Sequence, residues 1–372
     1  MTLSLSFNKN NLKKAIAVAK ASKPANGDYI IRFNYDKICI CSIGKRHVIT
    51  SNAKSISSID VDKNWISEEF HIPVQKLVLF DQSDYDHMNF TFDGNIINIE
   101  SVSGSSRKKA SIRRRSDIKR RNMIPNFRTD FLYRVNSEKF CNILHCVGCS
   151  ALVHGTKTEE EMRLNQVHFY SLNDKAYSST RFQASVSDAC GFGIDISVIS
   201  VDIPIIKTFC SKFDIVGIRD DKNKLCIIDA DDESTDSIIV INKVVANKPE
   251  YKNIDTGGFS TELKFDKETM MSSLDWAISA IDGTQRVTCD ISSDSIKMSS
   301  GVEILDTPIN LIKGNAVKVD LPVRYLRSMV NHINSREVIM KLGHKDVPAI
   351  IEISENDDNL NVRHYVLSMK SR

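Results

Sequence analysis

The chain has 372 residues, of which 41% are hydrophobic and 26% are charged, and its formal net charge is +3. This length predicts two or three domains, and this composition argues against a disordered chain because it is close to that of soluble globular proteins. No apolar run approaches the roughly 18 residues of a membrane-spanning helix, and no basic leader precedes an apolar core, so neither a membrane span nor a signal peptide is expected. The nine scattered cysteines are expected to be reduced thiols in a cytoplasmic protein.

Three segments have the period of an amphipathic helix that follows a short strand. Their apolar residues recur at the i, i+3, i+4, i+7 spacing that predicts one buried helix face. The candidate N-caps are Asn8, Asn136 or Ser137, and Asp266. The expected helices, with their buried residues, are 7–22 (Leu12, Ala15, Ile16, Ala19), 135–150 (Phe140, Ile143, Leu144, Val147) and 265–281 (Met270, Leu274, Ala277, Ile278, Ile281).

A proline-led element recurs once after each of these helices. It reads FHIPVQKLVLF (70–80), VDIPIIKTFC (201–210) and VDLPVRYLRSM (319–329), which predicts a strand end followed by a short helix. Proline favours the first helical turn because its missing N–H is not needed there. The prolines are 131 and 118 residues apart, and the first helices begin 128 and 130 residues apart. Two markers with nearly the same period indicate a threefold internal repeat.

Alternating strand patterns occupy the rest of each repeat. Polar breaks predict hairpins at 29–43, 166–180 and 286–300 before the proline element and at 88–101, 215–230 and 337–354 after it. The predicted fold is therefore α+β, with two helices packed on antiparallel sheets in each repeat. Polar, proline-containing connectors at 123–130 and 248–258 predict three domains with the bounds 1–128, 129–255 and 256–372.

Three short motifs accompany the repeat. They are the connector KPEYKNI (248–254), the segment RLNQVHFYSLNDKAYSSTRFQAS (163–185) and the ending RHYVLSMKSR (363–372). Together with the repeat, they resemble the bacterial β-type sliding clamps, the processivity factors of replicative DNA polymerases. The matching family sequences are Phe-Pro-Asp-Tyr-Arg-Arg-Val, Thr-Asp-Gly-His-Arg-Leu-Ala and Tyr-Val-Val-Met-Pro-Met-Arg-Leu. Lys252 and Asn253 replace two arginines and the tail lacks the proline, which suggests a phage or other mobile-element clamp.

The resemblance implies a fold and a function. It implies three clamp domains in each chain and a head-to-tail homodimer that closes into a ring around double-stranded DNA. Such a protein is not an enzyme and needs no cofactor or metal. It tethers a DNA polymerase by topology, and it binds the polymerase and a clamp loader through short peptide motifs, in the cytoplasm of a bacterium or a phage-infected cell. The alternative is a scaffold of the same fold that tethers transcription machinery to DNA.

Cations on the expected helices are the candidate DNA-facing residues. A lining of this kind would contact phosphates without reading bases, because base contacts would stop sliding. An ordinary solvated helix face is the alternative for each lysine taken alone. The candidates are Lys13, Lys20, Lys23, Lys76, Lys139, Lys157, Lys207, Lys212, Arg324 and Arg327.

The resemblance also carries over a groove that binds partner peptides. Leu164 and Phe182, with Tyr177 and Arg181 beside them, match its apolar positions in the second domain. The remaining positions match the connector and the tail, at Pro249, Ile254, Leu367 and Met369. The alternative is that the apolar residues among these are core.

A basic run at 107–121 has nine cations against the single acid Asp117, which leaves −5 for the rest of the chain. It is expected to begin in the last strand of the first domain and to contact DNA or an acidic partner, unless it is a solvated loop. A nuclear-targeting segment is a further possibility from composition. The cations are Arg107, Lys108, Lys109, Arg113, Arg114, Arg115, Lys119, Arg120 and Arg121.

A cysteine and histidine cluster lies on and after the second expected helix, at Cys141, His145, Cys146, Cys149 and His154. A zinc site of a nucleic-acid-modifying enzyme is one interpretation. One straight helix cannot wrap four ligands around an ion, and the C-x₂-C pairs of structural zinc sites are absent. Ordinary reduced cysteines are therefore the preferred interpretation, and no phosphate-loop, nucleophile-elbow or metalloprotease motif argues for catalysis.

Overall fold

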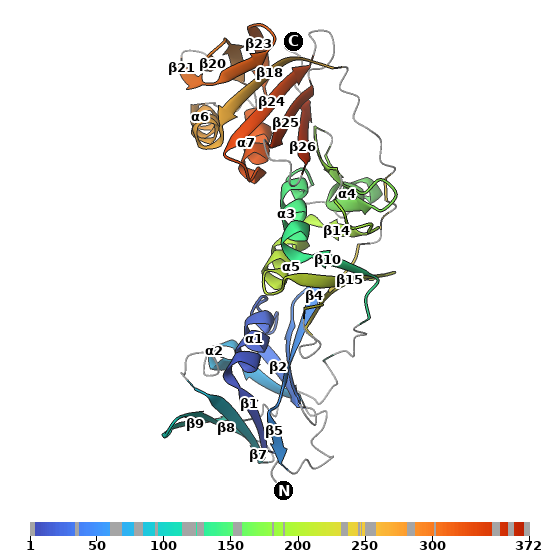
Figure 1. The fold of residues 1–372 in the computed structure, drawn as a ribbon, viewed down its shortest axis with the longest axis vertical. Helices are drawn as coiled ribbons and strands as arrows, with labels where there is room; N and C mark the ends of the chain where they lie inside the picture. Colours follow the sequence, from blue (N-terminus) through green and yellow to red (C-terminus); the bar gives the residue numbers. More distant parts are fainter. Residues whose placement is uncertain are drawn as a thin grey trace. The chain divides into compact units, whose positions relative to one another are not determined.

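The computed structural model describes residues 4–33, 37–59, 69–77, 85–93, 96–113, 124, 130–151, 158–180, 182–188, 190–231, 237–244, 246, 248–249, 258–280, 287–300, 303–343, 350–355 and 361–367. Helices alternate with antiparallel strands along the chain (Figure 1), as the sequence predicts. None of the helices among these residues is long and apolar enough to cross a membrane.

The element order repeats three times, and the bounds are as follows. The first repeat contains β1 (Ser4–Asn8), α1 (Lys9–Ala19), β2 (Asp28–Phe33), β3 (Lys37–Ile43), β4 (His47–Lys54), β5 (Ser57–Ile59), β6 (Glu69–Pro73), α2 (Val74–Leu77), β7 (His87–Asp93), β8 (Ile96–Ser103) and β9 (Ser106–Arg113). The second contains β10 (Tyr133–Asn136), α3 (Ser137–Gly148), α4 (Glu159–Leu164), β11 (Gln166–Tyr170), β12 (Lys175–Ser179), β13 (Gln183–Ser187), β14 (Ser197–Ile199), a 3₁₀ turn (Ser200–Asp202), α5 (Ile203–Cys210), β15 (Ile215–Asp221), β16 (Lys224–Asp229) and β17 (Ile238–Asn242). The third contains β18 (Phe259–Asp266), α6 (Lys267–Ala280), β19 (Val287–Ile291), β20 (Ser295–Ser300), β21 (Glu303–Pro308), β22 (Asn310–Lys313), β23 (Val317–Leu321), α7 (Val323–His332), β24 (Glu337–Gly343), β25 (Ile350–Glu355) and β26 (Val362–Leu367).

The chain forms two compact units, each with two sheets. Unit 1 comprises 1–138 and 204–243, and unit 2 comprises 139–203 and 244–372. Unit 1 holds the sheets β5-β1-β7-β8-β9 and β10-β15-β16-β17-β4-β3-β2-β6, and unit 2 holds β14-β11-β12-β13-β26-β25-β24-β18-β22 and β21-β20-β19-β23. The second repeat is divided between the units because each of its two sheets continues into a neighbouring repeat. The domain bounds near 128 and 255 stay a prediction.

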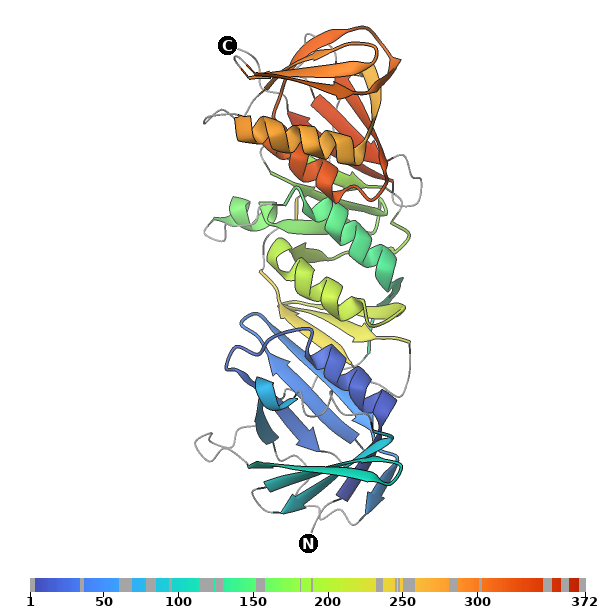
Figure 2. The same cartoon turned by 90° about the vertical axis from the view of Figure 1, so that its left-hand side faces the viewer.

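In unit 1, α1 covers one face of the eight-stranded sheet. Leu12 and Ile16 of this helix join one apolar core with Ile31 and Ile40 of the sheet. The carbonyl group of the Asn8 side chain accepts a hydrogen bond from the backbone N–H of Asn11 at 2.8 Å, which confirms the expected N-cap. Figure 2 shows α1 and α5 on the same face of this sheet.

The opposite face of that sheet is covered by part of the first connector. Ile124 packs on Ile30 and Cys39. Its backbone N–H donates to the Glu69 carboxylate at 3.0 Å, and its carbonyl accepts from Arg32 at 2.9 Å. Helices therefore occupy one face of the sheet and connector residues the other.

In unit 2, α3 and α7 lie on one face of the nine-stranded sheet (Figure 2). Phe140 of α3 packs on Phe169 of β11, with ring centroids 5.5 Å apart. Leu326 and Met329 of α7 share a core with Ile353 of β25, together with residues of α6. The expected buried residues of the first two long helices are all buried, and in α6 Met270, Leu274 and Ala277 are buried, Ile278 is partly exposed and Ile281 lies outside the described residues.

Candidate nucleic-acid and partner interfaces

Six of the candidate DNA-facing lysines lie in unit 1, on or directly after its helices. Lys13 of α1 has its ammonium 5.8 Å from the ring centroid of Tyr85 and is partly exposed. Lys76 ends the described part of α2 and is exposed. Because α1 and α5 share one face of a sheet, their cations are presented on the helix-covered side of unit 1. The other members of this set are Lys20, Lys23, Lys207 and Lys212.

Three further candidates lie in unit 2 and differ in their surroundings. Lys139 of α3 has its ammonium 5.7 Å from the ring centroid of Phe192, so this charge is held against an aromatic face. Arg324 of α7 is exposed. Arg327, one turn later, donates to the Asp275 carboxylate at 2.7 Å, and this carboxylate raises the pKa of Arg327. Arg327 is therefore partly neutralised, whereas Lys157 lies outside the described residues.

Neighbouring cations on the same helices are turned to other partners. The ammonium group of Lys14 lies 3.6 Å from the Asp229 carboxylate and 5.3 Å from the ring centroid of Phe213. Lys14 thus links α1 to the segments around α5 within unit 1. Sequence spacing separates it from Lys13 by one residue only, and the long-range partners explain the different roles.

An exposed apolar pair in unit 2 forms the centre of the candidate peptide groove. The backbone N–H of Leu367 donates to the carbonyl of Phe182 at 3.0 Å, so the end of β26 lies beside the start of β13. Phe182 is 43% exposed and Leu367 is 38% exposed. The ring of Phe182 stacks on Tyr325 of α7, with centroids 6.1 Å apart. Sequence reasoning missed Tyr325, because only the fold brings α7 to this place.

Tyr177 lies farther along the sheet. It packs on a small apolar cluster of Ala184, Val186 and Tyr365. Tyr365 and Leu367 are two residues apart on β26 and therefore share a face of the sheet. The structure thus places Tyr177, Phe182 and Leu367 on adjacent strands of one sheet, which the sequence alone could not show.

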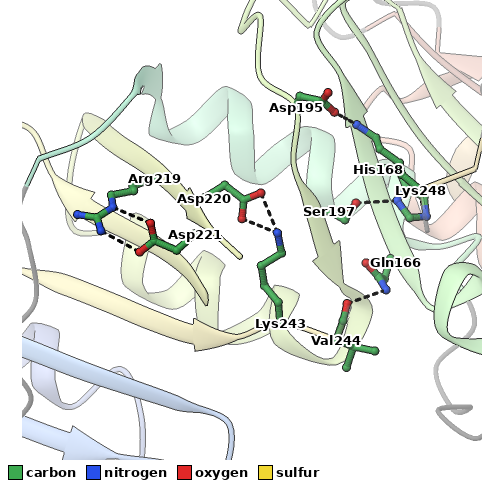
Figure 3. Close-up of polar contacts among 10 residues, drawn as sticks. All are labelled: Gln166, His168, Asp195, Ser197, Arg219, Asp220, Asp221, Lys243, Val244 and Lys248. Atoms are coloured by element: carbon green, nitrogen blue, oxygen red, sulfur yellow. Dashed lines mark hydrogen bonds and ion pairs between the residues drawn. The ribbon is translucent and has the colours of Figure 1, made fainter. Parts of the chain in front are cut away.

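The second connector is anchored on β11 of the same unit (Figure 3). Tyr170, which sequence reasoning also missed, donates its hydroxyl to the carbonyl of Pro249 at 2.7 Å. Lys248 pairs with Asp195, and its ammonium lies 4.2 Å from the Tyr170 ring centroid. Gln166 donates to the carbonyl of Val244 at 3.4 Å. These bonds fix Pro249 beside β11, as the groove requires.

Leu164 ends α4, a helix that was not predicted. A capping box between Thr158 and Glu161 starts this helix, and Leu164 is partly exposed at its other end, two residues before β11. Leu164 and Pro249 therefore flank the same strand. The remaining groove candidates, Arg181, Ile254 and Met369, lie outside the described residues.

A buried histidine supports this region from below. His168 of β11 accepts from the hydroxyl of Ser197 at 2.8 Å and donates from Nε2 to the carbonyl of Arg163 at 3.0 Å. Burial lowers the pKa of His168 to about 4, so the ring is neutral at pH 7. Both ring nitrogens are used structurally.

The start of the connector is held separately in unit 1. Lys243 donates to both oxygens of Asp220, at 2.6 and 2.7 Å. On the next residue, Asp221 accepts two hydrogen bonds from Arg219, at 3.1 and 2.9 Å. Figure 3 also shows these pairs. They tie the end of β17 to β15.

Four cations of the basic run lie on β9, as expected for the last strand of the first repeat. Arg107, Lys108, Lys109 and Arg113 are exposed on this edge strand. Arg107 and Lys109 lie 3.8 and 3.5 Å from the Glu100 carboxylate. The other cations of the run, Arg114, Arg115, Lys119, Arg120 and Arg121, lie outside the described residues.

The cysteine and histidine cluster does not converge. Among the described side chains, no three His, Cys, Asp or Glu residues could hold a metal ion. The thiol of Cys146 donates to the carbonyl of His332 at 3.1 Å, and the His145 and His332 rings lie 4.6 Å apart. Cys149 lies 3.4 Å from the hydroxyl of Ser185. His154 is outside the described residues, so the reduced-thiol interpretation stays a prediction.

Comparisons with known proteins identify the fold. No protein-family model matches the chain, and no curated protein sequence matches it. The structure is similar to the beta chain of DNA polymerase III from Streptococcus pneumoniae, with a TM-score of 0.75, 15% identity and 100% of both chains covered. It is similar to the beta subunit from Thermotoga maritima, with a TM-score of 0.72, 14% identity and 100% of both chains covered. The DNA polymerase sliding clamp from Pseudomonas aeruginosa gives a TM-score of 0.73 at 11% identity, over 99% of this chain and 100% of that one. The chain therefore has the fold of these proteins along its full length.

Proposed function

We propose that this chain is a DNA sliding clamp, a homodimeric ring that encircles duplex DNA and tethers a DNA polymerase during processive replication. The observation that carries the proposal is the full-length similarity in fold to bacterial polymerase clamps. Two copies supply six repeats, and closed symmetry is the common rule for oligomers of one chain. The chain acts without catalysis and without a cofactor, because tethering needs topology and a high effective concentration of the polymerase.

The DNA contact is electrostatic and non-specific. The exposed cations of the helix-covered faces, such as Lys76, Lys212 and Arg324, meet phosphates and read no base. Each contact is weak and is easily exchanged for the next phosphate along the duplex, which permits sliding. The whole candidate set, including Lys157, remains part of this proposal.

The exposed pair of Phe182 and Leu367 anchors short peptides from the DNA polymerase and the clamp loader. Two exposed apolar side chains beside a stacked tyrosine, Tyr325, give a few anchor contacts, which is how such interfaces concentrate their binding energy. Leu164, Tyr177 and Pro249 border this patch on the same strands or connector. Arg181, Ile254 and Met369 complete the proposed groove.

The proposed setting is the cytoplasm of a bacterium or of a phage-infected cell. A phage or other mobile-element origin is supported by the low identity to bacterial clamps, 15% or less in the structures compared above. It is also supported by the departures at Lys252, Asn253 and the tail. Phage structural genes next to the coding sequence would bear this out, and a chromosomal replication-origin neighbourhood would contradict it.

Order-of-addition binding on linear DNA tests the ring. A ring can thread onto a linear duplex over its ends, so no loader is required. With biotinylated ends, protein added before streptavidin should stay on the DNA in high salt, and protein added after streptavidin should not. Retention that is independent of this order, and is lost in salt, would mean simple electrostatic binding and would overturn the proposal. Averaged electron micrographs should show particles with a central hole.

The groove is tested with a matched pair of apolar truncations. Phe182→Ala should weaken binding of a fluorescent polymerase C-terminal peptide by at least about tenfold, a hot-spot loss. Leu172→Ala is the control, because Leu172 is 98% exposed in the β11–β12 turn and lies in the same unit. Equal binding by both variants would contradict the groove while leaving the ring untouched.

A further inference from the structure

Consecutive repeats of this chain are joined by the same pair of strands. In unit 1, β17, the last strand of the second repeat, pairs with β4 of the first repeat. In unit 2, β26, the last strand of the third repeat, pairs with β13 of the second. β4 and β13 hold the same place, since each is the third strand of the meander that follows the first helix, β2-β3-β4 or β11-β12-β13. One rule therefore describes both junctions: a last strand pairs with a third meander strand.

This rule leaves two strands over. β9 is the last strand of the first repeat and ends the five-stranded sheet. β21 is the third strand of the meander β19-β20-β21 and ends the four-stranded sheet. Within the described residues, each has a strand partner on one side only. Their outer backbone groups are available for a strand of another molecule.

The two free edges carry opposite charge. β9 reads SRKKASIR, with four cations and no acid. β21 reads EILDTP, with two acids and no cation. Ile304 of β21 is 69% exposed, a large apolar residue on an open edge. Charge alone would only keep such edges from pairing with themselves, but opposite charge makes each edge selective for the other.

The strand ladders give the register on the β9 side. From the third-last residue of β1, β10 or β18, cross-strand partners lead through the next two strands to one residue of the last strand. That residue is Lys109 in the first repeat, Ile238 in the second and Arg363 in the third. Lys109 therefore holds the place of the two residues that pair at the internal junctions.

The same procedure gives the register on the β21 side. At the internal junctions, Ile238 pairs with Thr50 and Arg363 pairs with Val186. In the first repeat, the residue two before the proline leads across the meander to Thr50. In the third repeat, the corresponding route leads to Ile304. Ile304 therefore holds the place of Thr50.

We propose that β9 of one copy pairs antiparallel with β21 of a second copy, with Lys109 opposite Ile304 and Arg107 opposite Asp306. The inference deepens the proposed function, because it specifies the contact that closes the homodimer. Side chains directly opposite on antiparallel strands lie about 4.5–5.5 Å apart at Cβ. Arg107 then exchanges its 3.8 Å contact with Glu100 for the exposed Asp306. The aliphatic part of Lys109 covers Ile304.

This pairing gives the basic strand a protein partner in place of a polyanion. Twofold symmetry makes the two junctions of a dimer identical, so one charge pair acts twice. Because exposed ion pairs are screened by salt, the dimer is expected to dissociate more readily as ionic strength rises. The part of the run beyond Arg113 is not needed for this contact.

Charge reversal and its rescue test the pairing. Arg107→Asp and Asp306→Arg should each raise the dimer dissociation constant by at least tenfold in sedimentation equilibrium. The double variant restores opposite charges at both junctions and should return within about threefold of the unmodified chain. Lys313→Glu, on the exposed edge strand β22, is the control and should leave the dimer unchanged. A dimer that neither single variant weakens would overturn the register and leave the clamp proposal standing.

A disulfide test resolves the register directly. Lys109→Cys combined with Ile304→Cys should form an interchain disulfide on mild oxidation, and Lys109→Cys combined with Ile312→Cys should not. The nine native cysteines give little background, since all are buried except the partly exposed Cys149. A disulfide within one chain, or equal cross-linking by both pairs, would overturn the inference. An unmodified chain that stays monomeric at every concentration would refute the ring as well.

Discussion

Acid should weaken unit 2 through two histidines that are buried in the neutral state. His168 of β11 is 2% exposed and His364 of β26 is fully buried. Burial lowers the pKa of His168 to about 4 and that of His364 to about 3. Nδ1 of His364 lies 2.7 Å from the Ser185 hydroxyl, and its Nε2 has no hydrogen-bond partner among the described residues. A proton on this ring would be buried without compensation.

The sign and size of the effect follow from linkage. The unfolded chain binds a proton at each histidine below a pKa of about 6.5, whereas the folded chain does not until the pH approaches 4 or 3. Stability is therefore complete above pH 6.5 and is lost as the pH falls below it. At pH 5 each histidine costs about 2 kcal/mol, and the two together cost about 4 kcal/mol of the free energy of unfolding of unit 2.

Hydrogen exchange measures this loss where it occurs. A chain of two compact units need not unfold in one transition, so protection of β11 and β26 is followed at pH 7 and pH 5, with the chemical exchange rate corrected for pH. A variant with both His168→Gln and His364→Gln should lose most of the difference, although it starts less stable at pH 7. His87→Gln in unit 1 is the control. A loss below about 1 kcal/mol in the unmodified chain, or an equal loss in the double variant, would refute the reasoning.

Three further predictions concern charge, packing and capping. Arg324→Ala should lower the slope of log DNA affinity against log salt by about 0.9 for one lost phosphate contact, whereas Arg327→Ala should lower it less because Asp275 already pairs with Arg327; equal slopes would contradict this. Leu326→Ala removes a fully buried side chain of α7 and should cost about 2–5 kcal/mol in denaturant unfolding of unit 2, so a cost near zero would mean that this core repacks freely. Asn8→Ala should cost about 1 kcal/mol in unit 1 by removing the cap of α1; Asn8→Ser should retain most of it, and equal losses would argue against capping as the cause.

Local patterns predicted the elements that depend on nearby residues. Leu12, Ile16 and their equivalents in α3 and α6 are buried because a 3.6-residue period places them on one helix face. The prolines lie at or next to the start of a helix in each repeat, as their missing N–H favours. The hairpins are also in place. α4 was missed although Thr158 and Glu161 form a capping box, a signal that was present in the sequence.

Contacts between distant residues could not be read in this way. Tyr325 reaches Phe182 only because α7 packs on a sheet that the second and third repeats share. Lys13 and Lys14 look alike in the sequence, yet Lys14 faces Asp229 from another repeat. The groove therefore depended on a resemblance to a family, while its geometry required the fold. The domain bounds remain open for the same reason, since each sheet of the second repeat continues into a neighbour.

The basic residues of this chain divide into two groups that salt should affect in different orders. Cations on the helix-covered faces, such as Arg324, would act on DNA only after the ring has closed. Cations on β9, such as Arg107, would act on closure itself. Rising salt should therefore open the dimer in free solution, while rings already on end-blocked DNA should leave only at the rate of opening. If Arg107→Asp shortens that lifetime and Arg324→Ala does not, the two groups have separate roles; if both shorten it alike, the β9 cations contact DNA and the inferred junction is wrong.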